Sequence, residues 1–191
     1  MGGATRFVSS DIETPAPPGV VLVDGRSGSG KTTLAARMAV ELGGTGEPAQ
    51  VLHLDLLYPG WDGLAEGSLA VAAVLRDGWY CPYNWHAGKF SSKRITIDPA
   101  RPLVIEGCGA LTEANLEAAR EWVLSAVPAG AGAGNVRAVW LECDEAIRRE
   151  RALARDGETF APHWERWAAQ EAVHYAAHKP WRLASEVGAA S

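Results

Sequence analysis

The sequence has few cysteines, no long apolar run and no excess of positive charge. Its three cysteines, Cys81, Cys108 and Cys143, form neither a C-x-x-C pair nor a metal-ligand spacing with histidine. This usage argues against a disulfide scaffold and predicts a reduced, cytoplasmic setting. No apolar run approaches the ~20 residues that a membrane-spanning helix needs. The N-terminus has polar and acidic residues where a signal peptide would have its apolar core.

Charge and length narrow the classes of partner and the number of domains. The 18 basic and 23 acidic side chains give a net charge of −5, so we expect no nucleic-acid partner and no membrane partner. Any anion must then bind at a local site. The 191 residues, of which 47% are apolar, fit one globular domain. We predict a polar, proline-rich lead over residues 1–19 and a single domain over residues 20–191, and leave a homo-oligomer open.

One glycine-rich stretch matches a complete phosphate-binding pattern. Residues 25–32 read G-R-S-G-S-G-K-T, which is G-x-x-x-x-G-K-[ST]. In this pattern backbone N–H groups surround the phosphates, the lysine reaches the β- and γ-phosphates, and the hydroxyl ligates Mg²⁺. The predicted cofactors are therefore ATP and Mg²⁺. The candidate nucleotide-binding residues are Gly25, Arg26, Ser27, Gly28, Ser29, Gly30, Lys31, Thr32 and Thr33.

The elements around this loop alternate between strand and helix. A β-branched run at 20–23 precedes the loop and a helix-forming run at 33–42 follows it, as a phosphate loop requires. Further strands are predicted at 51–55, 103–107 and 136–141, and helices at 64–75, 112–127, 145–155 and about 160–178. This order predicts an α/β fold with parallel strands. Residues 79–97 interrupt the alternation of strands and helices and predict a hairpin-like insertion. Residues 128–134 predict a flexible connection. Residues 181–191 stay unassigned.

Two carboxylates follow predicted strands. Asp55 and Glu106 should lie at the carboxyl edge of the sheet, where ligands of parallel sheets bind. Phosphoryl transfer needs charge neutralisation and an oriented nucleophile. Thr32 and Glu106 are our candidate Mg²⁺ ligands, and Asp55 is the candidate base. Which of the two acids contacts Mg²⁺ directly stays open, and so does the alternative that each only caps the next helix.

An arginine-rich helix follows Asp144, its predicted N-cap. Arg148, Arg151 and Arg155 share one face of it. Asp144 lies four residues before Arg148 and could neutralise it, whereas the other two have no acid at that spacing. Arg151 and Arg155 are therefore candidate catalytic residues, in a lid over about 144–160 that stabilises the transferring phosphoryl group. The alternative is a solvated face.

The aromatic residues and histidines divide between core and site. We predict that four tryptophans lie in the core: Trp122, Trp140, Trp164 and Trp167. Three others lie in turns or in the insertion and could form an aromatic wall for a planar substrate: Trp61, Trp79 and Trp85. His53, inside a predicted strand, is interpreted as a core histidine, and His86 as a candidate substrate contact.

Taken in order, these motifs resemble the uridine kinase branch of the P-loop nucleoside kinases, and more closely the bacterial uridine kinase-like ATP-binding proteins. After the loop come Asp55-Leu56-Leu57-Tyr58, then Tyr83-Asn84-Trp85, then Glu106-Gly107 and finally Arg155-Asp156. Similar proteins have an acidic residue where Asn84 stands, and Asp62 matches the second ribose-binding acid of the family only loosely. The resemblance covers residues 20–178.

The resemblance implies a three-layer α/β/α P-loop NTPase fold with a mainly parallel five-stranded sheet, a β-hairpin insertion and an Arg-rich helical lid. It also implies that Asp55 activates a substrate hydroxyl. The implied substrate-binding residues are Asp55, Tyr58, Asp62, Tyr83, Asn84, Trp85 and His86. We therefore predict an ATP-dependent phosphotransferase whose small-molecule acceptor is a nucleoside. The alternatives are a kinase of another small alcohol, such as a sugar, vitamin or antibiotic, and an ATP-hydrolysing switch or binding module.

Overall fold

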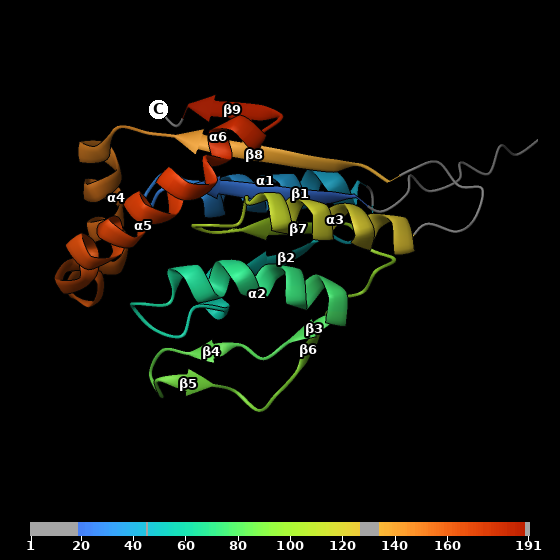
Figure 1. Ribbon diagram of the computed structural model, residues 1–191, viewed down its shortest axis with the longest axis horizontal. Helices are drawn as coiled ribbons and strands as arrows, with labels where there is room; N and C mark the ends of the chain where they lie inside the picture. Colours follow the sequence, from blue (N-terminus) through green and yellow to red (C-terminus); the bar gives the residue numbers. More distant parts are fainter. Residues whose placement is uncertain (1–18, 45, 127–133, 190–191) are drawn as a thin grey trace, which may run out of the picture.

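The centre of the molecule is a five-stranded sheet in which all strands run parallel, in the order β2-β7-β1-β8-β9 (Figure 1). The computed structural model describes residues 19–44, 46–126 and 134–189, so residues 1–18 of the predicted lead and 128–133 of the predicted connection lie outside the description. The strands are β1 (Val20–Gly25), β2 (Gln50–His53), β7 (Leu103–Glu106), β8 (Val136–Glu142) and β9 (Glu186–Ala189). The predicted α/β fold with a mainly parallel five-stranded sheet is confirmed.

The sheet is covered by helices on both faces, which explains why β1 is apolar on both sides. Val21 and Val23 pack with residues of α1 (Lys31–Gly43), whereas Val20 and Leu22 belong to the cluster formed with α2 (Leu64–Asp77) and α3 (Glu113–Ala126). In Figure 1, α2 and α3 lie in front of the sheet and α1 behind it. Successive residues of a strand point to opposite faces, so one apolar run builds both halves of the core.

The C-terminal third adds two longer helices and the last strand. Helix α4 (Glu145–Phe160) is interrupted at Gly157, whose φ of 53° and ψ of −135° are not helical, and a short second segment extends it to Phe160, past its predicted end. A short η2 (Ala161–His163) leads into α5 (Trp164–His178). The tail that the sequence left unassigned forms α6 (Pro180–Leu183) and β9, which pairs with β8 at the edge of the sheet. Trp122, Trp140, Trp164 and Trp167 are buried, as predicted.

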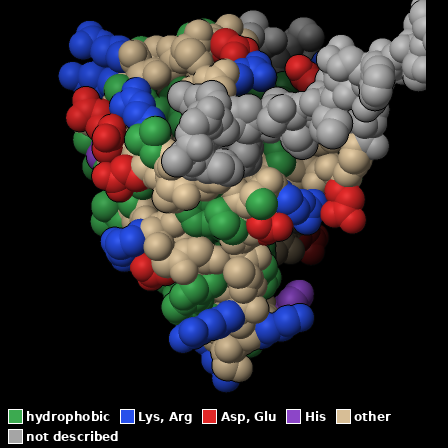
Figure 2. All heavy atoms as spheres, turned by 90° about the vertical axis from the view of Figure 1, so that its right-hand side faces the viewer, with side chains coloured by type: hydrophobic (Ala, Val, Ile, Leu, Met, Phe, Trp, Pro, Cys, Tyr) green, Lys and Arg blue, Asp and Glu red, His purple; other side chains and the backbone are tan. Residues whose placement is uncertain are grey.

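Residues 79–97 form two short antiparallel pairs outside the main sheet. Strand β3 (Trp79–Tyr80) pairs with β6 (Ile95–Thr96), and β4 (Tyr83–Asn84) with β5 (Lys89–Phe90). The segment contains no acidic residue. Its basic side chains, Lys89, Lys93 and Arg94, are exposed, and Figure 2 shows Lys and Arg side chains gathered at this lower end of the molecule. Among the described residues, no helix is long and apolar enough to cross a membrane.

A close approach between α2 and the segment after β2 fixes the position of Tyr58. A Cβ atom at Gly67 would lie 2.3 Å from Cδ1 of the Tyr58 ring. That ring is 1% exposed, and its hydroxyl donates a hydrogen bond of 2.8 Å to the carbonyl oxygen of Cys108. The glycine in α2 therefore lets a fully buried tyrosine lie against the helix.

We expect Gly67→Ala to lower the free energy of unfolding. Alanine favours the helix by about 1 kcal/mol over glycine, but displacing a buried ring costs about 1–3 kcal/mol, and this contact is severe. Urea unfolding followed by circular dichroism should show a lower midpoint and an unchanged m-value. A higher midpoint would mean that the ring moves at no cost.

Candidate active site

The carboxyl edge of the sheet opens into a cavity of about 610 Å³. The phosphate loop forms one side of it, through Ser27, Gly28, Lys31 and Thr32. The strand ends contribute His53, Asp55 and Glu106. An aromatic wall and residues near the end of α4, Arg155 and Thr159, form the remainder. Four of the predicted nucleotide-binding residues and the predicted base, Asp55, thus share one cavity.

The phosphate loop depends on glycine at two positions. Gly28 has a φ of +79°, and a Cβ there would lie 2.1 Å from the carbonyl oxygen of Arg148 on α4. Gly30 has a φ of +91° and is the N-cap of α1, with open space around the place of a Cβ. Left-handed backbone is costly for any other residue. The loop therefore curves into α1, whose N-terminus favours anions.

Lys31 is buried and its Nζ donates a hydrogen bond of 3.0 Å to the carbonyl oxygen of Arg26. Burial alone would lower the pKa of Lys31, but the acidic groups around it, among them Glu106, Glu171 and Asp24, raise it above the ordinary value. The ammonium group is therefore charged at neutral pH. It lies on the wall of the cavity, where a phosphate could replace the carbonyl as its partner.

Thr32, Glu106 and His53 form a chain of hydrogen bonds at the cavity. The Thr32 hydroxyl donates to Oε1 of Glu106 at 3.2 Å, and Nδ1 of His53 lies 2.6 Å from the same oxygen. Burial acts to raise the pKa of Glu106, but the bond with His53 and the charge of Lys31 lower it below its ordinary value. The same bond raises the pKa of His53, against the effect of burial.

The side chains of Thr32 and Glu106 are suited to binding Mg²⁺. A hydroxyl and a carboxylate are oxygen ligands that Mg²⁺ accepts when phosphates and waters complete its shell. Within the described part of the chain, no cluster of three His, Cys, Asp or Glu residues could hold a metal by itself.

The interpretation of His53 as a core histidine is corrected by the structure. Its side chain is 40% exposed and lines the cavity. It is the last residue of β2, at the carboxyl edge of the sheet.

Asp55 lies one residue into η1 (Leu54–Leu56), directly after β2. Its side chain borders the cavity and is exposed. Neighbouring protein groups still desolvate the carboxylate in part, and this desolvation, with the charge of Glu106, raises the pKa of Asp55, while Lys31, Arg155 and His53 act to lower it. A raised pKa makes a carboxylate a stronger base. Nε1 of Trp85 donates to the backbone oxygen of Asp55 at 2.8 Å and ties the insertion to this edge.

The aromatic wall comes from separate parts of the chain. Trp61 lies 4.8 Å from Trp85 and 5.4 Å, stacked, from Phe160, measured between ring centroids. Its other neighbours are His163, stacked at 4.3 Å, and Trp167 at 6.3 Å. Trp61, Trp85, Phe160 and Trp167 all line the cavity, together with Tyr58. Trp79 does not line it and instead packs under Arg94.

Several predicted substrate residues have other partners. The carboxylate of Asp62 pairs with Arg166, and Oδ1 of Asn84 accepts a hydrogen bond from the backbone N–H of Ala87 at 2.9 Å. Tyr83 packs against Trp85, with ring centroids 5.4 Å apart. None of Asp62, Tyr83, Asn84 and His86 is among the residues that line the cavity. Tyr58 lines it, but its hydroxyl is bonded to Cys108.

Only some of the candidate residues of the phosphate loop and the lid line the cavity. Of the predicted nucleotide-binding residues, Gly25, Arg26, Ser29, Gly30 and Thr33 do not line the cavity. Arg155 does line it. Arg151 does not, and its guanidinium reaches Sγ of Cys143 at 3.8 Å. The lid therefore stays a prediction.

Arg148 is a contact of the loop that the sequence reasoning missed. Asp144 caps α4 by accepting from the backbone N–H of Ala146 at 2.9 Å, as predicted. Arg148 is buried, and it donates to the carbonyl oxygens of Ser27 at 3.0 Å and Cys143 at 3.2 Å. Its position on the same helix face as Arg151 and Arg155 was the sequence signal that could have identified it.

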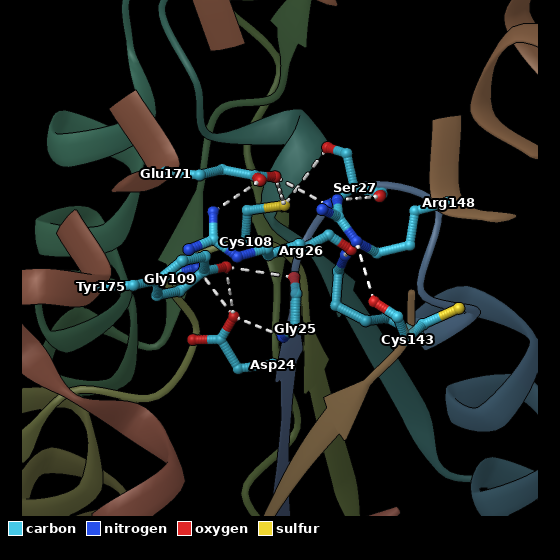
Figure 3. Close-up of polar contacts among 11 residues, drawn as sticks. Asp24, Gly25, Arg26, Ser27, Cys108, Gly109, Cys143, Arg148, Glu171 and Tyr175 are labelled. Carbon is cyan, nitrogen blue, oxygen red and sulfur yellow. Dashed lines mark hydrogen bonds and ion pairs between the residues drawn. The ribbon is translucent and has the colours of Figure 1, made fainter. Parts of the chain in front are cut away.

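Asp24 holds the base of the loop (Figure 3). Its fully buried Oδ1 accepts from the backbone N–H groups of Gly25 at 2.7 Å and Gly109 at 3.0 Å, and from the Tyr175 hydroxyl at 2.9 Å. Oδ2 accepts from the backbone N–H of Leu111 at 2.9 Å. Burial raises the pKa of Asp24 to about 6, although these hydrogen bonds lower it. The sequence signal that could have identified Asp24 was an acid directly after the apolar run at 20–23.

We expect the ionisation of Asp24 to reduce stability. Its pKa of about 6 exceeds the ordinary 3.8, so the folded protein binds the proton more tightly than the unfolded chain and stability falls as pH rises between these values. Relative to Asp24→Asn, the free energy of unfolding should fall by about 2 kcal/mol from pH 4 to pH 7. Urea unfolding of both proteins at each pH measures this difference, and a constant difference would contradict the expectation.

The comparisons with known proteins concern the fold. No protein-family model and no curated protein matches the chain. It is similar to the structure of a possible uridine kinase from Bacillus stearothermophilus, with a TM-score of 0.54 and 18% identity over 93% of this chain and 91% of that one. It is also similar to a candidate fructose transport system kinase from Silicibacter sp. TM1040, with a TM-score of 0.55 and 19% identity over 93% and 92%. These likenesses agree with the predicted α/β fold and its mainly parallel five-stranded sheet.

Proposed function

We propose that this protein is an ATP-dependent phosphotransferase that moves the γ-phosphate to a hydroxyl group of a small molecule. The observation that carries the proposal is the single cavity in which Lys31, Thr32 and Glu106 face Asp55 and an aromatic wall. A nucleotide switch would need the first three groups but neither a base nor an acceptor pocket. The two similar structures, both described as kinases, support the same class. We also expect the protein to work in the cytoplasm.

The phosphate loop and its neighbours would bind the donor. The N-terminus of α1 and the charged Lys31 attract the phosphates. Thr32 and Glu106 are the residues that would hold Mg²⁺, which neutralises phosphate charge when it is bound with the nucleotide. Arg155 lies on the cavity wall and adds positive charge on the side of the acceptor. These groups position and neutralise, which is most of what phosphoryl transfer requires.

Asp55 would orient the acceptor hydroxyl and take its proton. Its pKa is raised by partial desolvation and by the charge of Glu106, so the carboxylate accepts a proton more readily than an aspartate with the ordinary pKa. His53 keeps Glu106 hydrogen-bonded beside it. The two acids thus have different roles because their surroundings move their pKa values in opposite directions.

The aromatic wall supports an acceptor that combines a hydroxyl with a planar ring, and a nucleoside is the first class to test. Tryptophan faces and edges bind planar rings well. Asp62 and Asn84, however, are bonded to Arg166 and Ala87. We therefore propose that this acceptor is recognised through its ring and not through two ribose hydroxyls. A panel of nucleosides, aromatic alcohols, sugars and aminoglycosides, with ADP release as the readout, tests this choice.

We expect Asp55→Asn to lower kcat at least about 100-fold, because loss of a general base costs that much. Its affinity for Mg²⁺–ATP should change little, since the loop is intact. Acceptor-dependent ADP release and isothermal titration calorimetry measure the two effects. Asp77→Asn, at the exposed end of α2, is the matched control. Retained transfer, or an equal loss of ATP binding, would reject the assignment of Asp55.

We expect Glu106→Gln to raise the Mg²⁺ concentration needed for half-maximal ATP binding about tenfold, because an amide is a weaker Mg²⁺ ligand than a carboxylate. Binding of ATP in EDTA should fall much less. Calorimetric titrations with and without Mg²⁺ measure both. An unchanged Mg²⁺ requirement would remove Glu106 from the metal site.

A further inference from the structure

Helix α5 presents three side chains to the site at successive turns. Trp167, Glu171 and Tyr175 are spaced by four residues, so they lie on one face of the helix. Trp167 belongs to the aromatic wall, and the Tyr175 hydroxyl donates to Asp24. Glu171 lies between them, 1% exposed, and reaches the phosphate loop (Figure 3). This one helix thus touches the acceptor side of the cavity, the loop and the base of the loop.

The carboxylate of Glu171 holds two successive residues of the loop. Its Oε1 accepts a hydrogen bond from the backbone N–H of Ser27 at 2.7 Å, and its Oε2 lies 3.6 Å from the Arg26 guanidinium. The Cys108 thiol also donates to Oε1, at 3.3 Å. Burying a carboxylate is costly unless such partners compensate. Here the compensating partners are two residues of the loop, Arg26 and Ser27, and the thiol of Cys108.

Arg26 transmits this hold to the lysine. Its carbonyl oxygen accepts from Nζ of Lys31 at 3.0 Å and from the backbone N–H of Ser29 at 3.1 Å. Its guanidinium also lies 5.2 Å above the Tyr175 ring. Residues of α5 thus hold the side chain of Arg26. The backbone carbonyl of Arg26 in turn holds Lys31 and Ser29 in the middle of the loop.

We infer that Glu171 is a positioning residue, which keeps the first half of the phosphate loop in the shape that receives a nucleotide. The inference rests on the proposed function only in that this loop binds nucleotide phosphates. Glu171 commits the Ser27 N–H to itself, so this N–H stays off the phosphates and the later part of the loop receives them. Because Trp167 lies one helical turn before Glu171, the acceptor wall and the loop are carried by one rigid element.

Calorimetric binding of Mg²⁺–ADP to three variants tests the inference. Glu171→Ala should weaken binding at least about tenfold, which corresponds to one lost hydrogen bond to a charged group. Glu171→Gln keeps an oxygen that can accept from Ser27 and should stay within about threefold of wild type. Glu165→Gln changes an exposed glutamate of the same helix and should bind as wild type does. In an acceptor assay the alanine variant should show a raised KM for ATP with kcat nearly unchanged.

The outcomes separate the inference from the proposed function. Failure of wild-type protein to bind Mg²⁺–ADP would overturn the proposed function and the inference with it. Normal wild-type binding together with normal binding by Glu171→Ala, or an equal loss in the alanine and glutamine variants, would overturn the inference alone.

If the alanine variant does not fold, an NMR measurement on wild-type protein decides. The backbone amide of Ser27 should exchange slowly with solvent, and its chemical shift should change little when Mg²⁺–ADP binds, while the amides of Lys31 and Thr32 shift. A Ser27 shift as large as theirs would show that the phosphates take this N–H from Glu171, and the inference would be wrong.

Discussion

The carboxylate of Asp24 is the contact on which the geometry of the site depends. It lies at the end of the central strand and accepts hydrogen bonds from the start of the phosphate loop, from the segment after β7 and from α5. These three segments are far apart in sequence, and each carries part of the cavity wall. Water cannot replace the contact, because Asp24 is fully buried. One charged group therefore sets the distance between the loop and the second strand-end acid, Glu106.

Around this contact, acidic and basic groups alternate, and each changes the chemistry of the next. The acids near Lys31 keep it protonated in spite of its burial. Lys31 and His53 keep Glu106 ionised, and the charge of Glu106 in turn raises the pKa of Asp55. Two carboxylates at neighbouring strand ends thus differ in pKa, as the proposed roles of metal ligand and base require. Burial of Lys31 and Glu106 strengthens the electrostatic interaction between these two groups.

Local patterns in the sequence predicted much of the fold, but contacts between distant segments were beyond them. The apolar runs at 20–23, 51–55 and 103–107 and the glycine pattern at 25–32 predict their own local structure, and the position of Asp55 near a strand end followed from the run at 51–55. Strand β9 has only four residues at the sheet edge and depends on β8 for its pairing, so no local pattern marks it. Arg148, placed by its spacing from Asp144, turned to Ser27 because that carbonyl lies within its reach only after folding.

The insertion at 79–97 satisfies its backbone through its own antiparallel pairs and meets the site chiefly through Trp85. The parallel sheet does not need it for its own hydrogen bonds. The insertion and the parallel sheet can therefore accumulate substitutions under different evolutionary constraints. If the protein has the proposed function, substitutions in the insertion could change which compound is phosphorylated and leave nucleotide use untouched. Related proteins should then diverge fastest there, and exchanging the segment between them should exchange specificity.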